Sequence, residues 1–491
     1  MGVDKPGAGG KAAGVSPGAE TAGVGVVGDG EYRPRAGAGA VLHRATREGL
    51  AQLAAADTLL PTSLRREVGA YLRCGVLRHG FVRVRCEACD KECLVGFSCK
   101  GRGYCPSCNG KKAALAGLHL VQDVLPPAPY RQWTLSLPFR LRWLVLKHPR
   151  LLDRVLRVLL GRIATLQRRV ARRLGVPGHL RCGAVSFTQY FGSTLQLTPH
   201  LHVLCPDGVF SEADDGAVRF VTLPPPTPKD VARIATSLAR RVTRALGDMG
   251  LLDVHLPPDD DAEALRAHAL QQSLPFASVQ SLAAVQPRRH HRRLAVAEGF
   301  SLHADTHVAE NDRQGLERLC RYGARGPLAE ERLSRADDGR YVYRLRRPTP
   351  SGATSLVLTA AQLVRKLAAL VPPPRRHLLR FHGVFGPNAR LRPVVTRLGR
   401  EEVPPPAEAT PSPESPAPAR TKRPRIDWAT LLRHTFNLDV LQCPCGGRRR
   451  VLTAVTSPAI AEKVLREIGR LPPHQPLATG PPAPQLALPL P

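Results

Sequence analysis

Two histidines separated by one leucine lie in the run TPHLHVL at residues 198–204. The alternation predicts a β-strand, in which residues two apart share a face, so His200 and His202 would point to the same side. Two neighbouring imidazoles can bind a divalent cation, and a nuclease metal site needs at least a third ligand. Gln189 on the preceding predicted strand is one candidate, because an amide oxygen suits Mg²⁺. His303 and His307 are other possibilities, and a packed or surface histidine pair is the alternative to any metal site.

A tyrosine near the end of a predicted helix is the candidate nucleophile. The helical pattern of residues 313–324 starts after Asp312, and Tyr322 lies near the edge of its apolar stripe. A phenol with a pKa near ~10 is a poor nucleophile until it is deprotonated. Neighbouring cations favour the phenolate and hold the phosphate that it would attack. The predicted DNA contacts here are Arg313, Arg321 and Arg325, and a tyrosine packed at a helix end is the alternative.

Two C-x-x-C pairs predict a structural zinc site of the ribbon type. The four thiolates are those of Cys86, Cys89, Cys105 and Cys108. Each C-x-x-C turn offers two sulfurs on one side, and two such turns complete a tetrahedron. Three further cysteines lie nearby and could substitute or form a second site; they are Cys74, Cys93 and Cys99.

The same cysteine-rich segment carries several cations. Lys100, Arg102 and Lys111 are the predicted DNA contacts, because a small metal-pinned knuckle with exposed cations suits phosphate binding. The alternative is that these charges only solvate the knuckle.

The formal charge of the 491-residue chain is +31, which points to nucleic acid as a partner. An arginine-rich proteome is the alternative explanation of this charge. No apolar run is long enough for a membrane span, and the first residues lack the apolar core of a signal peptide. The sequence therefore predicts a cytoplasmic, nucleoid-associated protein without a membrane partner, whose reduced cysteines bind metal.

Composition and periodicity divide the chain into six segments. We expect a disordered tail at 1–40, helices and a zinc-binding domain at 41–124, a catalytic domain at 125–400 with an insertion at about 222–300, a Pro-rich basic linker at 401–425, a small C-terminal module at 426–472 and a disordered tail at 473–491. Strands are predicted at 130–137, 181–190, 200–205 and 300–308, and long helices at 149–174 and about 229–246.

Taken together, these motifs resemble one family. The stretch CEACDKECLVGFSCKGRGYCPSCNGKK resembles the zinc-binding domain of transposases of the insertion sequence 91 group and its common-region (ISCR-like) relatives, which are histidine–hydrophobic–histidine single-strand nucleases. GAVSFTQYFGSTLQLTPHLHVLCPDGVF resembles the metal-binding strands of that family, and GLERLCRYGARGPLAEERL its nucleophile helix. ALVPPPRRHLLRFHGVFGPNARLRPVV is similar to a further characteristic run. The resemblance covers roughly residues 40–400, with a fainter echo at 437–470.

The resemblance implies roles for the residues singled out above. Tyr322 would be the nucleophile, His200 and His202 would bind catalytic Mg²⁺ or Mn²⁺, and the cysteines would hold structural Zn²⁺. The implied activity is metal-dependent cleavage and strand transfer through a 5′-phosphotyrosine, of the rolling-circle type. The implied partners are single-stranded element ends and target DNA, and a homo-oligomer is one possible assembly. The implied fold is α+β, an antiparallel-sheet nuclease core with packed helices, preceded by a helical and zinc-ribbon-like module.

Three positions depart from the family pattern. Arg318 stands where some members have a second, earlier tyrosine, which indicates a single-tyrosine version. Thr198 stands where many members have asparagine. A C-terminal C-P-x-C motif is represented by Cys443-Pro444-Cys445, one residue short, and the sequence assigns it no ligand role.

Two other functions are compatible with the sequence. One is a non-catalytic, zinc-containing DNA-binding protein, which would tolerate Tyr322→Phe. The other is a rolling-circle replication initiator, which would use the same chemistry at a plasmid origin rather than at an element end.

Overall fold

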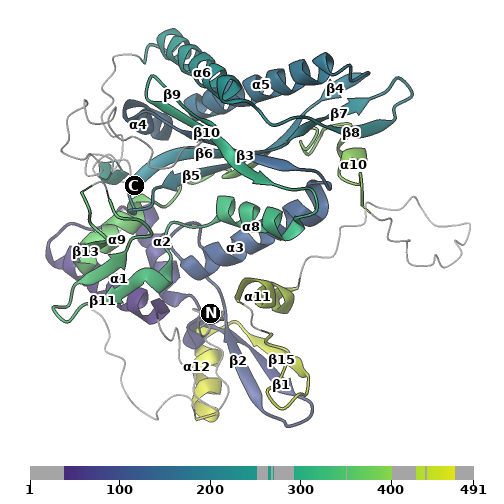
Figure 1. Ribbon diagram of the computed structural model, residues 1–491. Helices are drawn as coiled ribbons and strands as arrows, with labels where there is room; N and C mark the ends of the chain where they lie inside the picture. Colours follow the sequence, from purple (N-terminus) through teal and green to yellow (C-terminus); the bar gives the residue numbers. More distant parts are fainter. Residues whose placement is uncertain are drawn as a thin grey trace, which may run out of the picture.

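A computed structural model of the protein describes residues 38–251, 264–266, 269, 292–349, 351–400, 427–436 and 439–469 (Figure 1). Of the tail predicted at 1–40, residues 1–37 lie outside the described residues, and residues 38–40 form the start of a helix. The predicted tail at 473–491 and the predicted linker at 401–425 also lie outside the described residues.

The centre of the molecule is a six-stranded antiparallel sheet of order β14-β5-β6-β3-β10-β9. Its strands are β3 Tyr130–Ser136, β5 Gly183–Phe191, β6 Leu197–Pro206, β9 Leu294–Ala297, β10 Phe300–Val308 and β14 Leu379–Gly383. The four strands predicted from alternation are confirmed as β3, β5, β6 and β10. The α+β class is confirmed as well.

Three helices cover one face of this sheet. They are α4 Phe139–Lys147, α5 Pro149–Arg173 and α6 Pro228–Asp248 (Figure 1). Their apolar stripes meet the inward side chains of the strands, among them Leu201 and Val203 of β6. The alternation of β6 therefore places both histidines on the opposite face, as predicted. Although α6 belongs to the segment expected as an insertion, its packing on α5, β9 and β10 makes it part of this core.

The histidine face is covered by α8 Arg313–Ala324 and by α3 Pro106–His119, which continues as the π-helical turn η2 Leu120–Val124 (Figure 1). Glycines allow these elements to approach one another closely. A Cβ on Gly323 of α8 would lie 2.7 Å from the ring of Phe187 on β5, and one on Gly117 of α3 would lie 2.6 Å from Cγ of Arg321. The sheet, α8 and α3 are thus held in fixed layers.

A helical module lies beside α3. It consists of α1 Ala38–Ala55, α2 Thr62–Arg73 and α9 Ala360–Ala369, with the small sheet of β11 Leu333–Arg335, β12 Tyr341–Arg344 and β13 Ser355–Leu358. These elements share one apolar core with the first residues of α3. Another three-stranded sheet, of β4 His179–Arg181, β7 Gly208–Glu212 and β8 Val218–Thr222, lies at one end of the central sheet (Figure 1).

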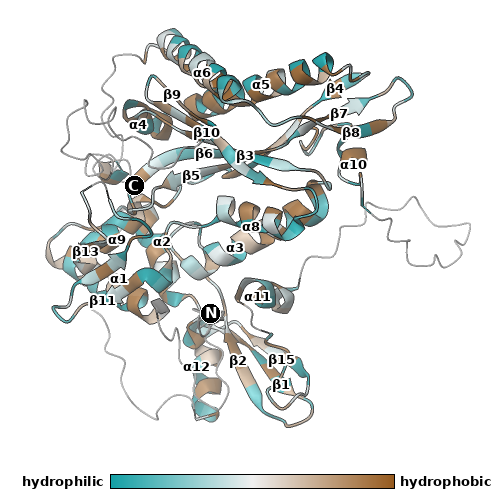
Figure 2. Ribbon diagram, in the orientation of Figure 1, coloured by the Kyte–Doolittle hydropathy of each residue, from teal (hydrophilic) through white to brown (hydrophobic). Residues whose placement is uncertain are grey.

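The N-terminal and C-terminal parts of the chain meet in one sheet of order β15-β1-β2. Its strands are β1 Phe81–Cys86, β2 Glu92–Gly96 and β15 Arg449–Val455, flanked by α11 Trp428–Phe436 and α12 Pro458–Glu467. Apolar residues form one small core between the sheet and α12 and another between the opposite face of the sheet and α11. Figure 2 shows hydrophobic residues, in brown, along these strands and helices. The segment expected as a separate C-terminal module therefore contributes a strand to the zinc-binding region. Within the described residues, no helix is long and apolar enough to span a membrane.

Candidate active site and metal centres

The two histidines of β6 lie side by side beneath α8. Their ring centroids are 4.8 Å apart, and Gln189 of β5 is the cross-strand partner of His200. Directly paired residues of an antiparallel sheet share a face, so these three side chains belong to one cluster. Among the residues that the structure describes, no carboxylate, thiol or third imidazole joins the two histidines in a compact ligand group.

Hydrogen bonds on the inner ring nitrogens orient both imidazoles. Nδ1 of His200 donates to the carbonyl of Thr198 at 2.8 Å, which leaves a lone pair on Nε2. Nδ1 of His202 lies 3.1 Å from Oγ1 of Thr134, and its Nε2 is buried without a hydrogen-bond partner. A buried nitrogen without a partner is costly unless a ligand satisfies it. The pair therefore fits a divalent cation, held by neutral imidazole nitrogens.

Burial favours the neutral form of both rings. It lowers the pKa of His202 to about 3 and also lowers the pKa of His200. Nearby Arg325 acts in the same direction on both. Metal ligation requires the neutral imidazole, so these rings do not have to lose a proton at neutral pH to bind an ion.

The lowered pKa of His202 has a consequence for stability. The unfolded imidazole titrates near 6.5 and the folded one at about 3. Below pH 6.5 the unfolded chain therefore binds a proton that the folded chain does not, and the free energy of unfolding falls as the pH falls towards 3. Without added divalent ion, we expect the wild type to lose about 1 kcal/mol more than His202→Gln between about pH 7.5 and about pH 5.5. Urea unfolding at the two pH values measures this difference, and equal losses in both proteins would contradict it.

Tyr322 lies next to the histidine pair, on the last turn of α8. The centroid of its ring is 5.9 Å from that of His202, and 39% of the residue is exposed. The guanidinium of Arg325 lies over the same ring at 4.7 Å and over the ring of Phe191 at 5.1 Å. The helix starts at Asp312, whose side chain accepts from the amide of Gly315. The structure thus brings together an accessible phenol and a cation from the end of α8 and two imidazoles from β6.

Gln189 connects the strand pair of β5 and β6 to α8. Its Nε2 donates to the carbonyls of Tyr322 and Gly323, both at 2.9 Å. Because both amide hydrogens are used on α8, Oε1 is the atom of this side chain that can accept or ligate. The other two possible third ligands lie on β10, and β3 separates that strand from β6. His303 is 3.6 Å from Asp305, and His307 is 3.9 Å from Asp207.

Two of the predicted DNA-contacting residues, Arg313 and Arg321, lie on α8 and interact with neighbouring protein groups. The guanidinium of Arg313 donates to the carbonyls of Val121, Leu125 and Pro126 at the end of η2, which ties α8 to that turn, and its contact with DNA stays a prediction. Arg321 is half-buried over Gly117 and forms an ion pair with Glu317 at 3.6 Å. The remaining predicted cations, Lys100, Arg102, Lys111 and Arg325, lie around the start of α3 and the end of α8.

A cavity of about 320 Å³ opens between these two helix ends. Its lining includes Gln189 and Arg325 from the active-site side and Arg102, Lys112 and Arg376 from the opposite side. Sequence reasoning did not single out Arg376, which lies in a connection just before β14, although the run that contains it resembles a characteristic run of the family. The cavity is therefore adjacent to α8 and is lined by several cations.

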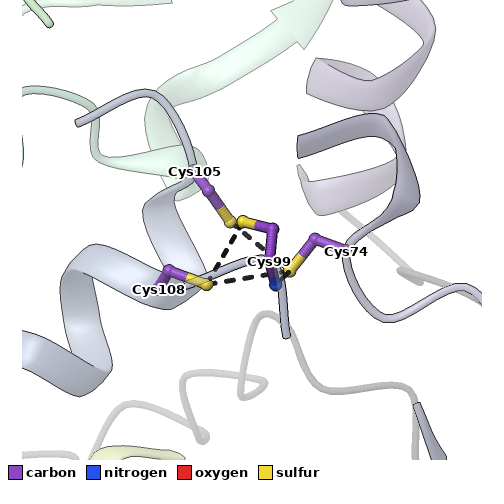
Figure 3. Close-up of side chains that lie close together, drawn as sticks. All are labelled: Cys74, Cys99, Cys105 and Cys108. Carbon is purple, nitrogen blue, oxygen red and sulfur yellow. Dashed lines mark hydrogen bonds between the residues drawn. The ribbon is translucent and has the colours of Figure 1, made fainter. Parts of the chain in front are cut away.

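The predicted single zinc site is wrong in its ligand set, because the structure divides its four cysteines between two groups. Cys105 and Cys108, at the start of α3, lie with Cys74 after α2 and with Cys99 (Figure 3). The sulfur of Cys108 is 3.8 Å from that of Cys74 and 3.4 Å from that of Cys99, and the sulfurs of Cys105 and Cys74 are 3.6 Å apart. Four sulfurs around Zn²⁺ at ~2.3 Å are separated by roughly 3.8 Å, so this group fits a tetrathiolate site.

Cys86 and Cys89 lie elsewhere, at the end of β1, and their neighbours are Cys443 and Cys445. The physical reason is the β1–β2 hairpin, which carries the first C-x-x-C pair away from the start of α3. Cys93, on β2, belongs to neither group and packs in an apolar core. The surplus of cysteines was the one sign in the sequence that two sites were possible.

Two family models match the chain in the regions just described. One, described as "Transposase zinc-binding domain" of the insertion sequence 91 type, matches residues 45–137, which contain the Cys74 group and α3. The other, described as "Putative transposase", matches residues 183–391, from β5 to the end of β14 and beyond, including both histidines and α8. No curated protein and no solved structure matches the chain. The zinc-binding match and the cysteine groups together support structural zinc. The chain belongs to the insertion sequence 91 family of transposases, which are DNA-processing enzymes.

Proposed function

We propose that this transposase cuts and rejoins single DNA strands with Tyr322 as the nucleophile. The observation that carries the proposal is the position of this accessible phenol, 5.9 Å from the ring of His202, whose buried Nε2 has no hydrogen-bond partner. A tyrosine packed only for stability would not need an unsatisfied imidazole beside it.

The proposed ligands of a catalytic Mg²⁺ or Mn²⁺ are the Nε2 atoms of His200 and His202 and the amide oxygen of Gln189. When bound, such an ion stabilises negative charge on the oxygens of the scissile phosphate. Gln189 has a second task, because its amide hydrogens bond the carbonyls of Tyr322 and Gly323 and so fix the nucleophile helix relative to the ligand set. Thr134 and the Thr198 carbonyl orient the imidazoles.

In the proposed first step, Oη of Tyr322 forms a bond to phosphorus and the bond from phosphorus to the 3′-oxygen breaks. The phenolic proton passes to solvent, and the departing 3′-oxygen takes up a proton, so the products are a 5′-phosphotyrosine and a free 3′-hydroxyl. Arg325 lies over the phenol ring, and its guanidinium is the proposed contact to the phosphate that Tyr322 attacks. In the second step, a 3′-hydroxyl attacks the same phosphorus and displaces Tyr322. The phosphodiester energy is conserved in the tyrosyl ester, and no nucleotide cofactor is consumed.

The cavity beside α8 is the proposed path of the DNA strand. Its volume of about 320 Å³ is small for a binding pocket and suits one unpaired nucleotide rather than a duplex. Arg102, Lys112 and Arg376 would contact the phosphates on the zinc-module side. The size of the cavity supports single-stranded DNA as the substrate. The family resemblance is the basis for proposing element ends as that substrate and rolling-circle movement as the process. The second cleavage would then be made by a second subunit or by a 3′-hydroxyl.

Neutralising Arg325 tests the proposed strand path. We expect Arg325→Gln to weaken binding of a single-stranded oligonucleotide by about 10-fold and to reduce the slope of log K against log salt by about 0.7, because one phosphate contact is lost. Fluorescence anisotropy over a series of salt concentrations measures both. The matched control is Arg240→Gln, an exposed arginine of α6 on the far face of the sheet. Equal effects of the two variants would mean that binding follows net charge alone.

The direct test of the proposed function is covalent trapping. The full chain is incubated with Mn²⁺ or Mg²⁺ and end-labelled single strands from the flanks of its own gene, and the products are separated under denaturing conditions. A labelled protein band that requires the metal supports the proposal. Tight binding without any such band would favour the non-catalytic DNA-binding alternative, and a band formed only with a plasmid origin strand would favour the replication initiator.

A further inference from the structure

We propose that Cys86, Cys89, Cys443 and Cys445 form a second tetrathiolate zinc site, which fastens the C-terminal part of the chain to the zinc-binding region. The two family matches end at residues 137 and 391, so neither contains the second half of this ligand set. The proposal concerns a structural metal and does not depend on the proposed nuclease chemistry.

The distances between the four thiols fit one bound ion. All four sulfurs lie within 4.8 Å of one another. The sulfurs of Cys86 and Cys445 are 3.5 Å apart, and those of Cys89 and Cys443 are 3.7 Å apart. A disulfide would need about 2.05 Å, whereas sulfurs around a tetrahedral Zn²⁺ are separated by roughly 3.8 Å. Neither pair is positioned as a disulfide, and the four atoms have the spacing of a zinc tetrahedron.

Each pair of cysteines lies on a tight turn closed by backbone hydrogen bonds, which we call a knuckle. Residues 86–90 form the first knuckle and residues 443–447 the second. In the first, the amide of Asp90 donates to the carbonyl of Cys86 at 3.1 Å, and Asp90 has a positive φ of 59°. In the second, the amide of Gly446 donates to the carbonyl of Cys443 at 3.0 Å, and the amide of Cys443 donates to the carbonyl of Gly447 at 2.9 Å. The C-P-C spacing, one residue shorter than C-x-x-C, is therefore closed by the two glycines that follow it.

Gly447 shows how closely the two knuckles approach. A Cβ at this position would lie 2.7 Å from Cβ of Ala88 and 2.9 Å from the sulfur of Cys86. Only glycine permits this contact without displacing the first knuckle. Gly447, the second of the two glycines after Cys445, thus allows the second knuckle to lie close to the first.

The sheet places the two knuckles at the same end. β15 pairs with β1 in antiparallel register, with Cys86 opposite Arg449, and the amide of Glu87 donates to the carbonyl of Arg448 at 3.0 Å. Cys86, the last residue of β1, therefore lies beside Arg449, the first residue of β15. Cys86 begins the first knuckle, and the second knuckle ends just before β15. A metal here joins residues that are more than 350 positions apart in the chain.

The fastened segment also supports the helix that underlies the active site. α11 packs on α3, where Nζ of Lys111 lies over the ring of Phe436 at 5.8 Å. α3 in turn packs on α8 through Gly117. The second site therefore completes a scaffold in which one tetrathiolate fixes the start of α3 and the other fixes the element that covers it.

Zinc content of the full-length protein tests the proposal. Purified wild type is expected to hold two zinc ions per chain by elemental analysis, and Cys443→Ser/Cys445→Ser is expected to hold one. The matched control is Cys182→Ser, whose half-buried thiol belongs to neither group and which should keep both ions. One zinc ion in the wild type, or two in the double variant, would overturn the proposal.

A second measurement covers the case in which the double variant folds poorly. The exposed Cys445 is changed to histidine, which can still ligate, and the protein is loaded with Co²⁺. We expect both sites to fill, with the thiolate-to-metal absorption of one site reduced and shifted relative to the wild type. An unchanged spectrum at full occupancy would show that Cys445 is not a ligand. Both experiments are done without DNA, so failure here is distinct from failure of the covalent-trapping test.

Discussion

Tyr322→Phe is expected to eliminate the covalent protein–DNA product and to reduce strand cleavage by about 10³-fold or more. The substitution removes the only atom that can bond to phosphorus from a side chain that is already 39% exposed. The ring contacts to His202 and Arg325 remain, so folding should change by less than about 0.5 kcal/mol and DNA affinity should be unchanged. Denaturing gels measure the adduct, and thermal unfolding checks the fold.

The matched control is Tyr190→Phe. Tyr190 lies on β5 near the same site, but burial raises the pKa of its phenol and makes it a poor nucleophile. The variant should therefore keep the covalent product. Retention of the adduct in Tyr322→Phe would contradict the assigned role, whichever result Tyr190→Phe gave.

His202→Ala is expected to abolish the response of cleavage to Mn²⁺ and to slow cleavage at saturating metal by at least about 100-fold. The variant removes one of two imidazoles, and the amide oxygen of Gln189 with a single histidine is a weak ligand set. Since the ring is buried, the cavity left behind should also lower stability, which His202→Asn would lessen. Cleavage rates over a series of Mn²⁺ concentrations separate the loss of metal affinity from the loss of rate.

His303→Ala is the informative comparison for the third ligand. His303 lies on β10 and is separated from β6 by β3, so its removal should leave the metal response intact. A loss as large as that of His202→Ala would instead place a ligand on β10 and remove Gln189 from the proposed set.

The strand and the helix that hold the candidate active-site residues could be predicted from the sequence. The pattern of apolar and polar side chains that identifies each of them involves only residues close together in the chain. Alternation in β6 separated His200 and His202 from Leu201 and Val203, and the structure packs the latter two against α4, α5 and α6. The period of residues 313–324 gave α8 with the observed bounds, because Asp312 is a good N-cap. These features depend on neighbours within a few residues.

Features set by distant parts of the chain were not predictable from the same patterns. The ligand partners of Cys86 and Cys89 are chosen by the pairing of β1 with β15, across most of the chain length. The strand β14 has no burial alternation, because it is a half-buried edge strand. Arg313 has the sequence context of a DNA contact, yet the carbonyls at the end of η2 occupy it. Tertiary contacts decide all three.

The most direct test of the account is to identify the residue that carries the DNA. The trapped adduct is digested with nuclease and then cleaved after glutamate, which releases residues 318–330 with Tyr322 as their only tyrosine. The account predicts a nucleotide joined through its 5′-phosphate to Tyr322, formed only with Mg²⁺ or Mn²⁺ present. Metal-dependent cleavage without any adduct would indicate attack by water, and an adduct on another residue would contradict the assignment of Tyr322 as the nucleophile.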